Sequence, residues 1–399
     1  MKISNKTFYK QHSIELERYL IGQKTLHVIN ESSKDKIVDD VSTKLYINPT
    51  STEPLLTNND ELFDTIIFTD IIESGRDIYE LLYNAKLKLK DNGKLIVTSV
   101  NTKYMFLTRL LENLRLKNKN ITQSYVHNKK ISNIASSVGF EFVNTTSKQL
   151  MPFSLFGIGT IFNKLLEIIL FRFILGIRTY SIFRNTVNNK NTYSKSIIIP
   201  AKNEEGNLVR LINRIPEFER CEVIIVCGKS TDNTLTVAKN IESNNMKFNI
   251  KVIEQTGKGK ANAVWEALQM STGETIAILD ADISVEPETL AQFFDIIDNN
   301  YADFVNGSRL IYEMEDGAMR GINKFGNRLF QYLISQVTRT HLTDSLCGTK
   351  VFKKDLIEKI FWWQKKFNLK DPFGDFDMIF TASFTGQKIT EYPVNYKAR

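Results

Sequence analysis

The stretch "GETIAILDADISVEP", Gly273 to Pro287, combines an apolar run with two closely spaced carboxylates, Asp280 and Asp282. The apolar run predicts a buried strand that ends at the first acid. Charges at the end of a buried strand cost free energy unless something neutralises them. The pair fits a helix start, a salt bridge or a metal site, and the surrounding sequence has to decide among the three.

The sequence around this stretch alternates between short apolar runs and amphipathic segments. Strands are predicted at "KSIIIP" (195–200), "CEVIIVC" (221–227), "NIKVIEQ" (249–255) and "ETIAILD" (274–280). Helical patterns separate them, which predicts a parallel, doubly wound α/β sheet. Ligands of such sheets bind at the carboxyl ends of the strands. There this sequence has polar or glycine-containing stretches: "PAKNEE", "CGKSTDN", "QTGKGK" and "DADIS".

The first half of the chain shows a weaker version of the same pattern. Strands are predicted at "KTLHVINE" (24–31) and "KLYINPT" (44–50), and "FDTIIFTDIIE" (63–73) predicts a strand that enters a loop. Residues 77–101 predict a helix, a turn at Asn92-Gly93 and a strand. The polar, Asn-rich run 184–195 predicts a linker. The predicted fold class is therefore α/β with two Rossmann-like domains, residues 1–183 and 196–399.

Composition excludes a disordered chain, since 42% of the 399 residues are hydrophobic. A net charge of +7 favours anionic partners such as phosphates, nucleotides or acidic lipids, and no nucleic-acid partner is expected. Cys221, Cys227 and Cys347 have no metal-ligand spacing, and residues 1–24 lack a secretory signal. A cytoplasmic protein is the expectation.

The segment Phe153 to Ile177 is the most apolar of the chain, but Lys164, Glu167 and Arg172 interrupt it. A membrane-spanning helix is therefore not expected, because no uninterrupted run of about 18 apolar residues exists. Two interpretations are open: a helix packed on the core of its domain, or a helix lying in the membrane interface at the inner face.

Two loops carry polar groups suited to a nucleotide. In "PAKNEEGNL" (200–208), Asn203 or Glu204 either caps the next helix or helps to seat a nucleobase and ribose. In "GKGKANAV" (257–264), Lys258 and Lys260 suit a phosphate or ribose, although the P-loop spacing is absent.

Taken in order, "IIIPAKNEEGNL", "STDNT", "GKGKANAV" and "ILDAD" resemble the nucleotide-sugar domain of family-2 glycosyltransferases, which have a GT-A fold. The resemblance continues through "FVNGSRL", "MEDGAMRGINKFGNRLF", "DSLCGTKVF", "DPFGDFD" and "EYPVNYKAR", and so covers residues 195–399. The most similar subgroup is the bacterial enzymes related to polyprenyl-phosphate (dolichol-phosphate-mannose-type) glycosyltransferases.

This resemblance implies a donor site. Asp280 and Asp282 would bind Mg²⁺ or Mn²⁺ and the sugar diphosphate, and Arg309 and Arg320 would contact the diphosphate or an acceptor phosphate. The whole implied donor-binding set is Pro200, Ala201, Lys202, Asn203, Glu204, Lys258, Lys260, Asp280, Ala281, Asp282, Arg309 and Arg320.

One segment departs from the family pattern. In "VCGKSTDNT", Cys227 and Lys229 flank Gly228 where the family usually has two acids, one of which contacts the base. Asp232 remains, and it either contacts the base or only caps the next helix. UDP is expected in preference to GDP.

Acids late in the sequence are candidates for the acceptor side. Asp375 is the first choice for a general base, Asp377 is its alternative, and Asp344 is a candidate positioning residue. Ordinary loop acids that pair with nearby lysines are the other interpretation. A phosphate acceptor is already ionised and hardly needs a base.

The first half resembles class I S-adenosylmethionine-dependent methyltransferases, through "FDTIIFTDIIES" and "LLYNAKLKLKDNGKLIVTSVN". Such enzymes follow the first strand with a Gly-rich turn. Here "VINESSKDK" has no glycine, and the second strand ends at Asn48 instead of an acid. A degenerate domain kept as a scaffold or acceptor-binding module, without S-adenosylmethionine, is therefore expected.

The resulting prediction is an inverting, metal-dependent glycosyltransferase that uses a nucleotide-diphosphate sugar. Its acceptor would be a polyprenyl phosphate or a lipid-linked saccharide in surface-polysaccharide synthesis. The alternatives are a catalytically silent binding or scaffold protein and a bifunctional methyltransferase–glycosyltransferase.

Overall fold

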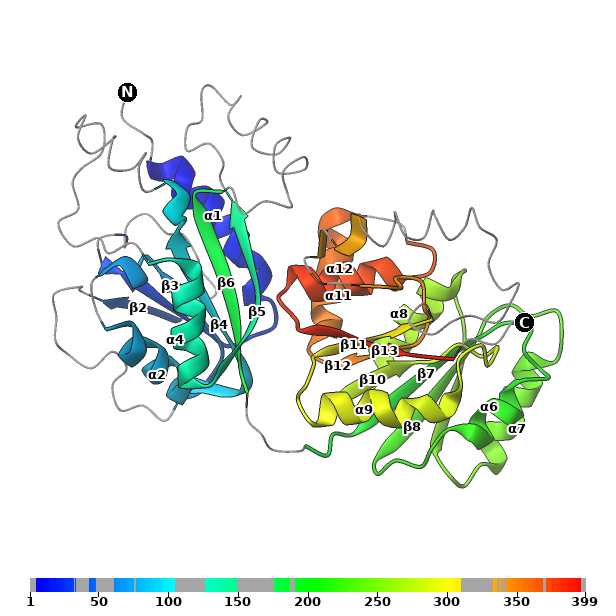
Figure 1. The fold of residues 1–399 in the computed structure, drawn as a ribbon. Coiled ribbons are helices and arrows are strands. Elements are labelled where there is room, and N and C mark those ends of the chain that lie inside the picture. Colours follow the sequence, from blue (N-terminus) through cyan, green and yellow to red (C-terminus); the bar gives the residue numbers. More distant parts are fainter. Residues whose placement is uncertain are drawn as a thin grey trace. The chain divides into compact units, whose positions relative to one another are not determined.

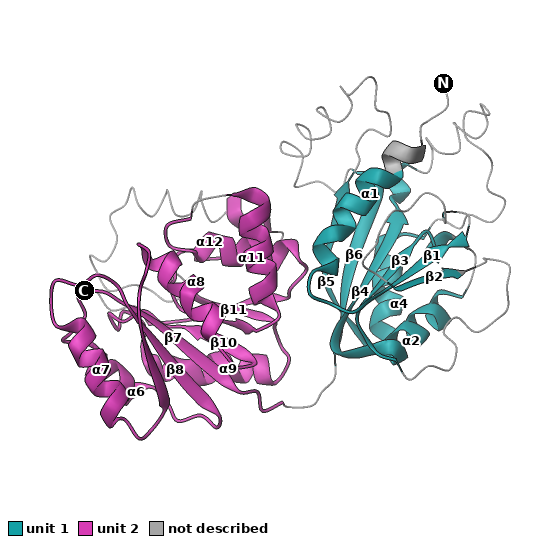
Figure 2. Cartoon of the chain, turned by 180° about the vertical axis from the view of Figure 1, so that it is seen from behind, with its two compact units in different colours: residues 1–187 teal, residues 188–399 magenta. Residues whose placement is uncertain are grey.

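The chain forms two compact units in the computed structural model, Met1–Val187 and Asn188–Arg399 (Figure 2). The structure describes residues 5–31, 33, 43–47, 61–74, 77–104, 126–148, 176–186, 191–309, 333–335, 337–338, 340, 342–368 and 371–395. Each unit has its own mixed sheet with helices on both faces (Figure 1).

The sheet of the first unit has the order β2-β1-β3-β4-β6-β5. Its strands are β1 (Thr25–Asn30), β2 (Thr43–Ile47), β3 (Phe63–Thr69), β4 (Leu89–Val100), β5 (Phe140–Lys148) and β6 (Arg178–Asn185). Strands β1 to β4 pair in parallel, whereas β6 runs antiparallel to both β4 and β5. The helices are α1 (Asn5–Leu20), α2 (Ile78–Lys88) and α4 (Asn128–Val138), with short 3-10 turns at Ile72–Ser74 and Thr102–Tyr104.

Side chains of β3 show how this sheet separates two cores. Ile66 packs with α2 and α4 on one face, whereas Ile67 packs with Leu16 of α1 on the other. Successive side chains of a strand point to opposite faces, so a continuous apolar strand needs cover on both sides. This is why the strand predicted at 63–73 is buried on both faces.

The strands predicted in the first half are present, with one difference. The turn expected at Asn92-Gly93 lies within β4, where Asn92 has a φ of 63° and the pairing with β3 shifts register. The strand continues on both sides of this irregularity, so a local turn signal marks a bulge here.

The sheet of the second unit has the order β13-β11-β12-β10-β7-β8-β9. Its strands are β7 (Lys195–Ala201), β8 (Cys221–Cys227), β9 (Asn249–Glu254), β10 (Thr275–Ile278), β11 (Phe304–Ser308), β12 (Lys350–Lys353) and β13 (Ile389–Pro393). The predicted parallel pairing of β7 to β10 is confirmed. Strand β12, for which no direction was predicted, runs antiparallel to β10 and β11, so the sheet as a whole is mixed.

Helices cover both faces of this second sheet. On one face lie α6 (Leu208–Arg214), α7 (Thr234–Asn244) and α9 (Leu290–Asp298), the last of which follows a 3-10 turn at Pro287–Thr289. On the other lie α8 (Lys260–Met270), α11 (Leu356–Phe367) and α12 (Asp375–Phe384).

The path of the chain through this sheet reverses between β7 and β10. From β7 it moves outward through β8 to β9, and it then crosses through α8 to place β10 on the other side of β7. Open α/β sheets bind ligands at such a reversal, outside the carboxyl ends of the strands. The carboxyl ends of β7 and β10 are therefore where a site is expected.

Two predicted connecting segments differ from the structure or fall outside it. The ends of the predicted linker 184–195 are strand, since Asn185 ends β6 and Lys195 begins β7. Except for Gly176 and Ile177, the apolar segment 153–177 lies outside the described residues. Within the described part of the chain, no helix has both the length and the apolar character needed to cross a membrane.

Candidate active site

The two aspartates of the opening motif lie directly after β10. Asp280 is half-buried and ion-paired with Lys260, with Nζ 2.5 Å from Oδ1. Asp282 accepts a hydrogen bond from the amide of Ser284 at 3.0 Å, and Ala281 between them is buried. Of the three interpretations open from the sequence, the salt bridge is observed for Asp280, whereas neither aspartate is the N-cap of the helical segments that follow, which are Glu286 and Thr289.

Lys260 is the first residue of α8 and lies between two acids. Burial lowers its pKa, but the negative charges of Asp280 and Asp375 outweigh that effect, and the net pKa is raised. Lys260 therefore remains a cation beside the aspartates and neutralises charge that would otherwise be unpaired.

Gly348 brings a third segment of the chain against the same aspartate. A Cβ atom added to Gly348 would lie 1.9 Å from Oδ2 of Asp280 and 2.6 Å from Nζ of Lys260. Any side chain here would overlap the carboxylate. The "DSLCGTK" segment therefore closes around the carboxyl end of β10 because residue 348 is glycine.

The loops after β7 and β8 are bound to each other. Asn203, at a φ of 56°, accepts a hydrogen bond from the amide of Thr231 at 2.8 Å. The amide of Glu204 donates to Oγ1 of Thr234 at 2.8 Å. Neither Asn203 nor Glu204 is the N-cap of α6, which is Asn207. Their capping alternative is therefore wrong, and they instead fix one loop on the other.

The residues at the ends of β7 and β8 differ in how much of each is exposed to solvent. Pro200 is half-buried and Ala201 buried at the end of β7, and Lys202 is exposed in the loop. Cys227 is buried, and burial raises the pKa of its thiol to about 11. This thiol therefore stays neutral and does not replace the missing acid.

Asp232 lies one residue before the N-cap of α7, which is Asn233. Its Oδ1 accepts from the amide of Thr234 at 3.0 Å, and its Oδ2 accepts from the amide of Glu205 at 3.2 Å. These bonds use the carboxylate to hold the two loops together.

Lys258 and Lys260 lie in different surroundings although only Gly259 separates them. Lys258 is exposed and lines a cleft of about 390 Å³, whereas Lys260 pairs with Asp280. Gly259 has a φ of 86°, a conformation that other residues rarely adopt. The cleft is lined by Lys258, Gly259, Ala261, Asn262, Trp265, Gln364, Asn368, Asp371, Pro372 and Asp377.

Asp375 and Asp377 both lie in the first turn of α12 but have different partners. Oδ1 of Asp375 is 2.7 Å from Nζ of Lys350, which is fully buried and also donates to the carbonyl of Cys347. Asp377 accepts from Nε1 of Trp363 at 3.1 Å, and burial raises its pKa. Only Asp375 is linked electrostatically to Lys260 and so to the aspartate pair.

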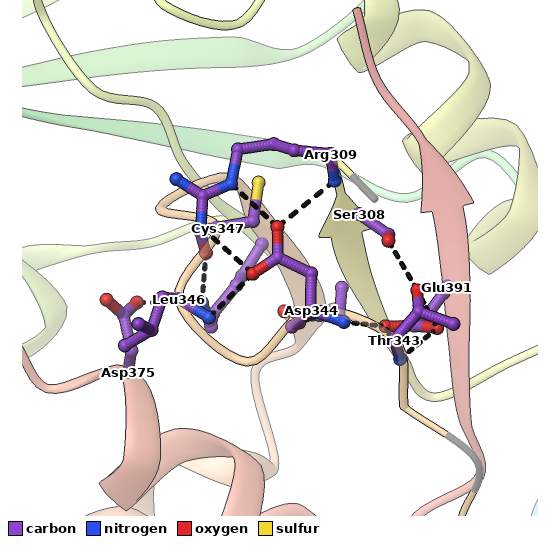
Figure 3. Close-up of polar contacts among 10 residues, drawn as sticks. Ser308, Arg309, Thr343, Asp344, Leu346, Cys347, Asp375 and Glu391 are labelled. Atoms are coloured by element: carbon purple, nitrogen blue, oxygen red, sulfur yellow. Dashed lines mark hydrogen bonds and ion pairs between the residues drawn. The ribbon is translucent and has the colours of Figure 1, made fainter. Parts of the chain in front are cut away.

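Asp344 holds Arg309 in a fork (Figure 3). Its Oδ2 lies 2.6 Å from Nε of Arg309, and its Oδ1 lies 3.0 Å from Nη2. Burial raises the pKa of Asp344, but the bonds and charge of Arg309 outweigh it and the net pKa is lowered. Asp344 is therefore an ionised anchor for Arg309 and a poor proton acceptor.

Three residues of this site were not among the predicted ones: Gly348, Lys350 and Glu391. The motifs that contain them are visible in the sequence, but each of the three acts on a partner distant along the chain. Lys350 begins β12, whose sequence KVFK has a lysine at each end, and nothing local distinguishes the buried lysine from Lys353. The predicted Arg320 lies outside the described residues.

The carboxylates of Asp280 and Asp282 are the oxygen ligands that this site offers to a hard divalent cation. Across the described ranges, no group of three or more His, Cys, Asp or Glu side chains could hold a metal ion. Asp280 and Asp282 are two carboxylates, and a protein cation already lies against one of them. Mg²⁺ is commonly bound by one or two carboxylates plus substrate phosphates, and these two acids fit that arrangement.

Comparison with known proteins gives a family match for the second unit. The model of Glycosyl transferase family 2 matches residues 196–361. The dolichyl-phosphate hexose transferase of Haloferax volcanii is 27% identical over 207 residues, which cover 51% of this chain and 83% of that protein. The UDP-N-acetylglucosamine–dolichyl-phosphate N-acetylglucosaminyltransferase of Methanococcus voltae is 30% identical over 176 residues, or 41% of this chain and 70% of that protein.

Among solved structures, glucosyl-3-phosphoglycerate synthase from Mycobacterium tuberculosis, in complex with Mn²⁺ and UDP, is 17% identical with a TM-score of 0.36. The superposition covers 52% of this chain and 73% of that one.

Proposed function

Because the chain belongs to glycosyl transferase family 2 through its second unit, we propose that this unit transfers a sugar from a nucleotide diphosphate to a polyprenyl phosphate. The observation that carries the proposal is the meeting of Asp280, Lys260 and Gly348 at the carboxyl end of β10. Both relatives are named for dolichyl phosphate, which supports a lipid phosphate acceptor.

Asp280 and Asp282 would hold Mg²⁺ or Mn²⁺ together with the diphosphate of the donor. When bound, the ion neutralises charge on the departing diphosphate. The ammonium group of Lys260, which pairs with Asp280, would then also contact a phosphate of the donor, because a lysine cation suits a phosphate as well as a carboxylate. UDP is the expected nucleotide because the Methanococcus relative is named for a UDP-sugar, and GDP is the alternative.

Arg309 and Asp375 would act on the acceptor side. The guanidinium of Arg309 binds Asp344 through Nε and Nη2, and its delocalised positive charge would attract phosphate oxygens. An acceptor phosphate is already ionised, so attack on the anomeric carbon needs no base, and Asp375 with Lys350 would position the acceptor. With a hydroxyl acceptor, such as a lipid-linked saccharide, Asp375 would be the general base in preference to Asp377.

A lipid acceptor lies in a membrane, so the transfer reaction would take place at a membrane surface. We place that reaction at the cytoplasmic face of the cell membrane, for which the net charge of +7 is suitable since acidic lipids attract cationic proteins.

The first unit would be a methyltransferase-like scaffold without S-adenosylmethionine. Its strand order β2-β1-β3-β4 reverses between β1 and β3, the position where such sheets bind ligands. Here Asp70 accepts from the hydroxyl of Tyr9 at 2.7 Å and pairs with buried Arg178 at 3.0 Å. Side chains of the protein thus satisfy the acid that follows β3.

Thermal shift tests the donor site. The chain is measured with UDP, GDP and dTDP, each with and without Mn²⁺, and with S-adenosylmethionine. We expect a metal-dependent stabilisation by one nucleotide, about 2.7 kcal/mol at a hundredfold excess over Kd. The double variant Asp280→Asn/Asp282→Asn should lose it.

No stabilisation by any nucleotide would contradict the proposed donor site and favour a silent binding protein. Stabilisation by S-adenosylmethionine would contradict the assignment of the first unit and favour the bifunctional alternative.

A further inference from the structure

We propose that Glu391 is a positioning residue that sets the direction of the Arg309 guanidinium by holding the main chain at residues 343–344. The inference rests on the proposed function, because it assumes that Arg309 binds a phosphate of the donor or acceptor. Glu391 itself is not expected to contact either substrate.

The carboxylate of Glu391 collects donors from one short segment (Figure 3). The amide of Thr343 donates to both of its oxygens, at 2.8 and 2.7 Å, and the hydroxyl of Thr343 donates at 2.8 Å. The amide of Asp344 donates to Oε1 at 3.0 Å. A carboxylate accepts several such bonds because both of its oxygens are acceptors. An amide side chain has only one acceptor oxygen and cannot replace it.

The same two residues of main chain are held from the other side. Asn306 of β11 is paired with Glu391 of β13 in the sheet, and its side-chain amide donates to the carbonyl of Asp344. Two residues further along β11, past Gly307, the hydroxyls of Ser308 and Thr343 lie 2.5 Å apart. Two adjacent strands therefore fix both the amide and the carbonyl of Asp344.

A fixed main chain at Asp344 determines where its carboxylate lies. That carboxylate accepts from the amide of Leu346 at 3.0 Å and from the amide of Arg309 at 3.1 Å, in addition to the two bonds from the guanidinium. Its orientation is thus set by the protein backbone, and a planar fork bonded to it by two atoms has little freedom left.

The segment that begins at Thr343 also reaches the aspartate pair. Four residues after Asp344, Gly348 lies against Oδ2 of Asp280. A shift of the main chain at residues 343–344 would therefore displace the phosphate-binding arginine relative to the proposed metal site. For this reason an effect on turnover is expected from a residue that touches no substrate.

The test is Glu391→Gln in the full chain. Glutamine has the same shape, but its NH₂ group would face the amides of Thr343 and Asp344, which are themselves donors. We expect kcat for transfer from the sugar nucleotide to dolichyl phosphate to fall roughly 10- to 100-fold, as for other residues that orient a binding group. The melting temperature should stay close to that of the control.

Glu274→Gln is the matched control. Glu274 also accepts hydrogen bonds from a backbone amide and a hydroxyl, both of Ser194, but at the opposite end of β10. Its loss should leave kcat unchanged. Arg309→Lys, alone and combined with Glu391→Gln, completes a double-mutant cycle.

If Glu391 acts through Arg309, the double variant will be no slower than Arg309→Lys. The inference would be overturned if the reductions in kcat of the two single variants multiplied in the double variant. It would also be overturned if kcat were the same for Glu391→Gln and Glu274→Gln. Either result would leave the proposed function standing. A wild-type chain that binds no nucleotide and transfers no sugar would overturn both.

Discussion

At the scale of single residues, the candidate site is a row of alternating charges. Asp280 pairs with Lys260 at 2.5 Å, Lys260 is also attracted to Asp375, and Asp375 pairs with Lys350 at 2.7 Å. Each of these two acids therefore has a lysine within ion-pairing distance before any ligand binds. Binding of a cation and a diphosphate would then exchange partners within a charge pattern that already exists.

Gly348 gives the residue-scale prediction. In Gly348→Ala the new methyl group would occupy the position of Oδ2 of Asp280, which has to move. We expect the Kd for UDP with Mn²⁺ to rise roughly 10- to 100-fold, measured by titration calorimetry. Gly206→Ala is the control, since a Cβ there meets no atom within 4 Å. Equal affinities of the two variants would mean that Asp280 does not bind the donor complex.

At the scale of elements, Glu222 ties three segments of the second sheet together. From β8 it accepts from Oγ of Ser196 on β7 at 2.6 Å and from the amide of Thr272 before β10 at 2.7 Å. Lys251 on β9 lies 2.9 Å away. Burial raises the pKa of Glu222, but these bonds outweigh it and lower the pKa to about 2.

The contribution of Glu222 should be visible in how the free energy of unfolding of the second unit changes at acid pH. A carboxyl group whose pKa is lowered by folding stabilises the protein above its unfolded pKa, and that contribution is lost as the pH falls toward the folded value. We expect the second unit to lose stability between about pH 4.5 and 2, and Glu222→Gln to be less stable at pH 7 with a flatter acid limb. Denaturant unfolding at several pH values measures both, and parallel curves for variant and wild type would refute this role.

The elements near the opening motif were predictable because their signals are local. Apolar runs such as 195–200 and glycine-containing loops lie next to each other in the sequence, and the parallel pairing of β7 to β10 follows from the helices between them. The direction of β12 and the fork of Asp344 on Arg309 were not predictable. Both depend on contacts between segments far apart in the chain, and no periodicity encodes them.

At the scale of the whole molecule, the chain divides into two compact units, each with its own hydrophobic core. Glu73 of the first unit is buried, and its carboxylate accepts from the amide of Val100 at 2.7 Å. Burial, and next to it the charge of Asp70, raises its pKa to about 7, although Arg178 acts in the opposite direction.

Calorimetry of the full chain should therefore show two transitions that respond to different variables. Between about pH 4.5 and 7 the unfolded state binds fewer protons than the folded one, so the first unit should lose on the order of 3 kcal/mol as the pH rises. Glu73→Gln should abolish this loss, and UDP with Mn²⁺ should shift only the other transition. A single transition that responds to both would show that the units unfold together.

The position of β13 at the edge of the second sheet has a consequence for synthesis on the ribosome. Strands β7 to β10 precede it in the chain and can pair as they leave the exit tunnel, bringing Lys260 to Asp280. The main chain at Asp344 lacks its acceptor until Glu391 has been translated and β13 has joined β11. A nascent chain stalled before that codon would carry the paired aspartates but not the oriented arginine.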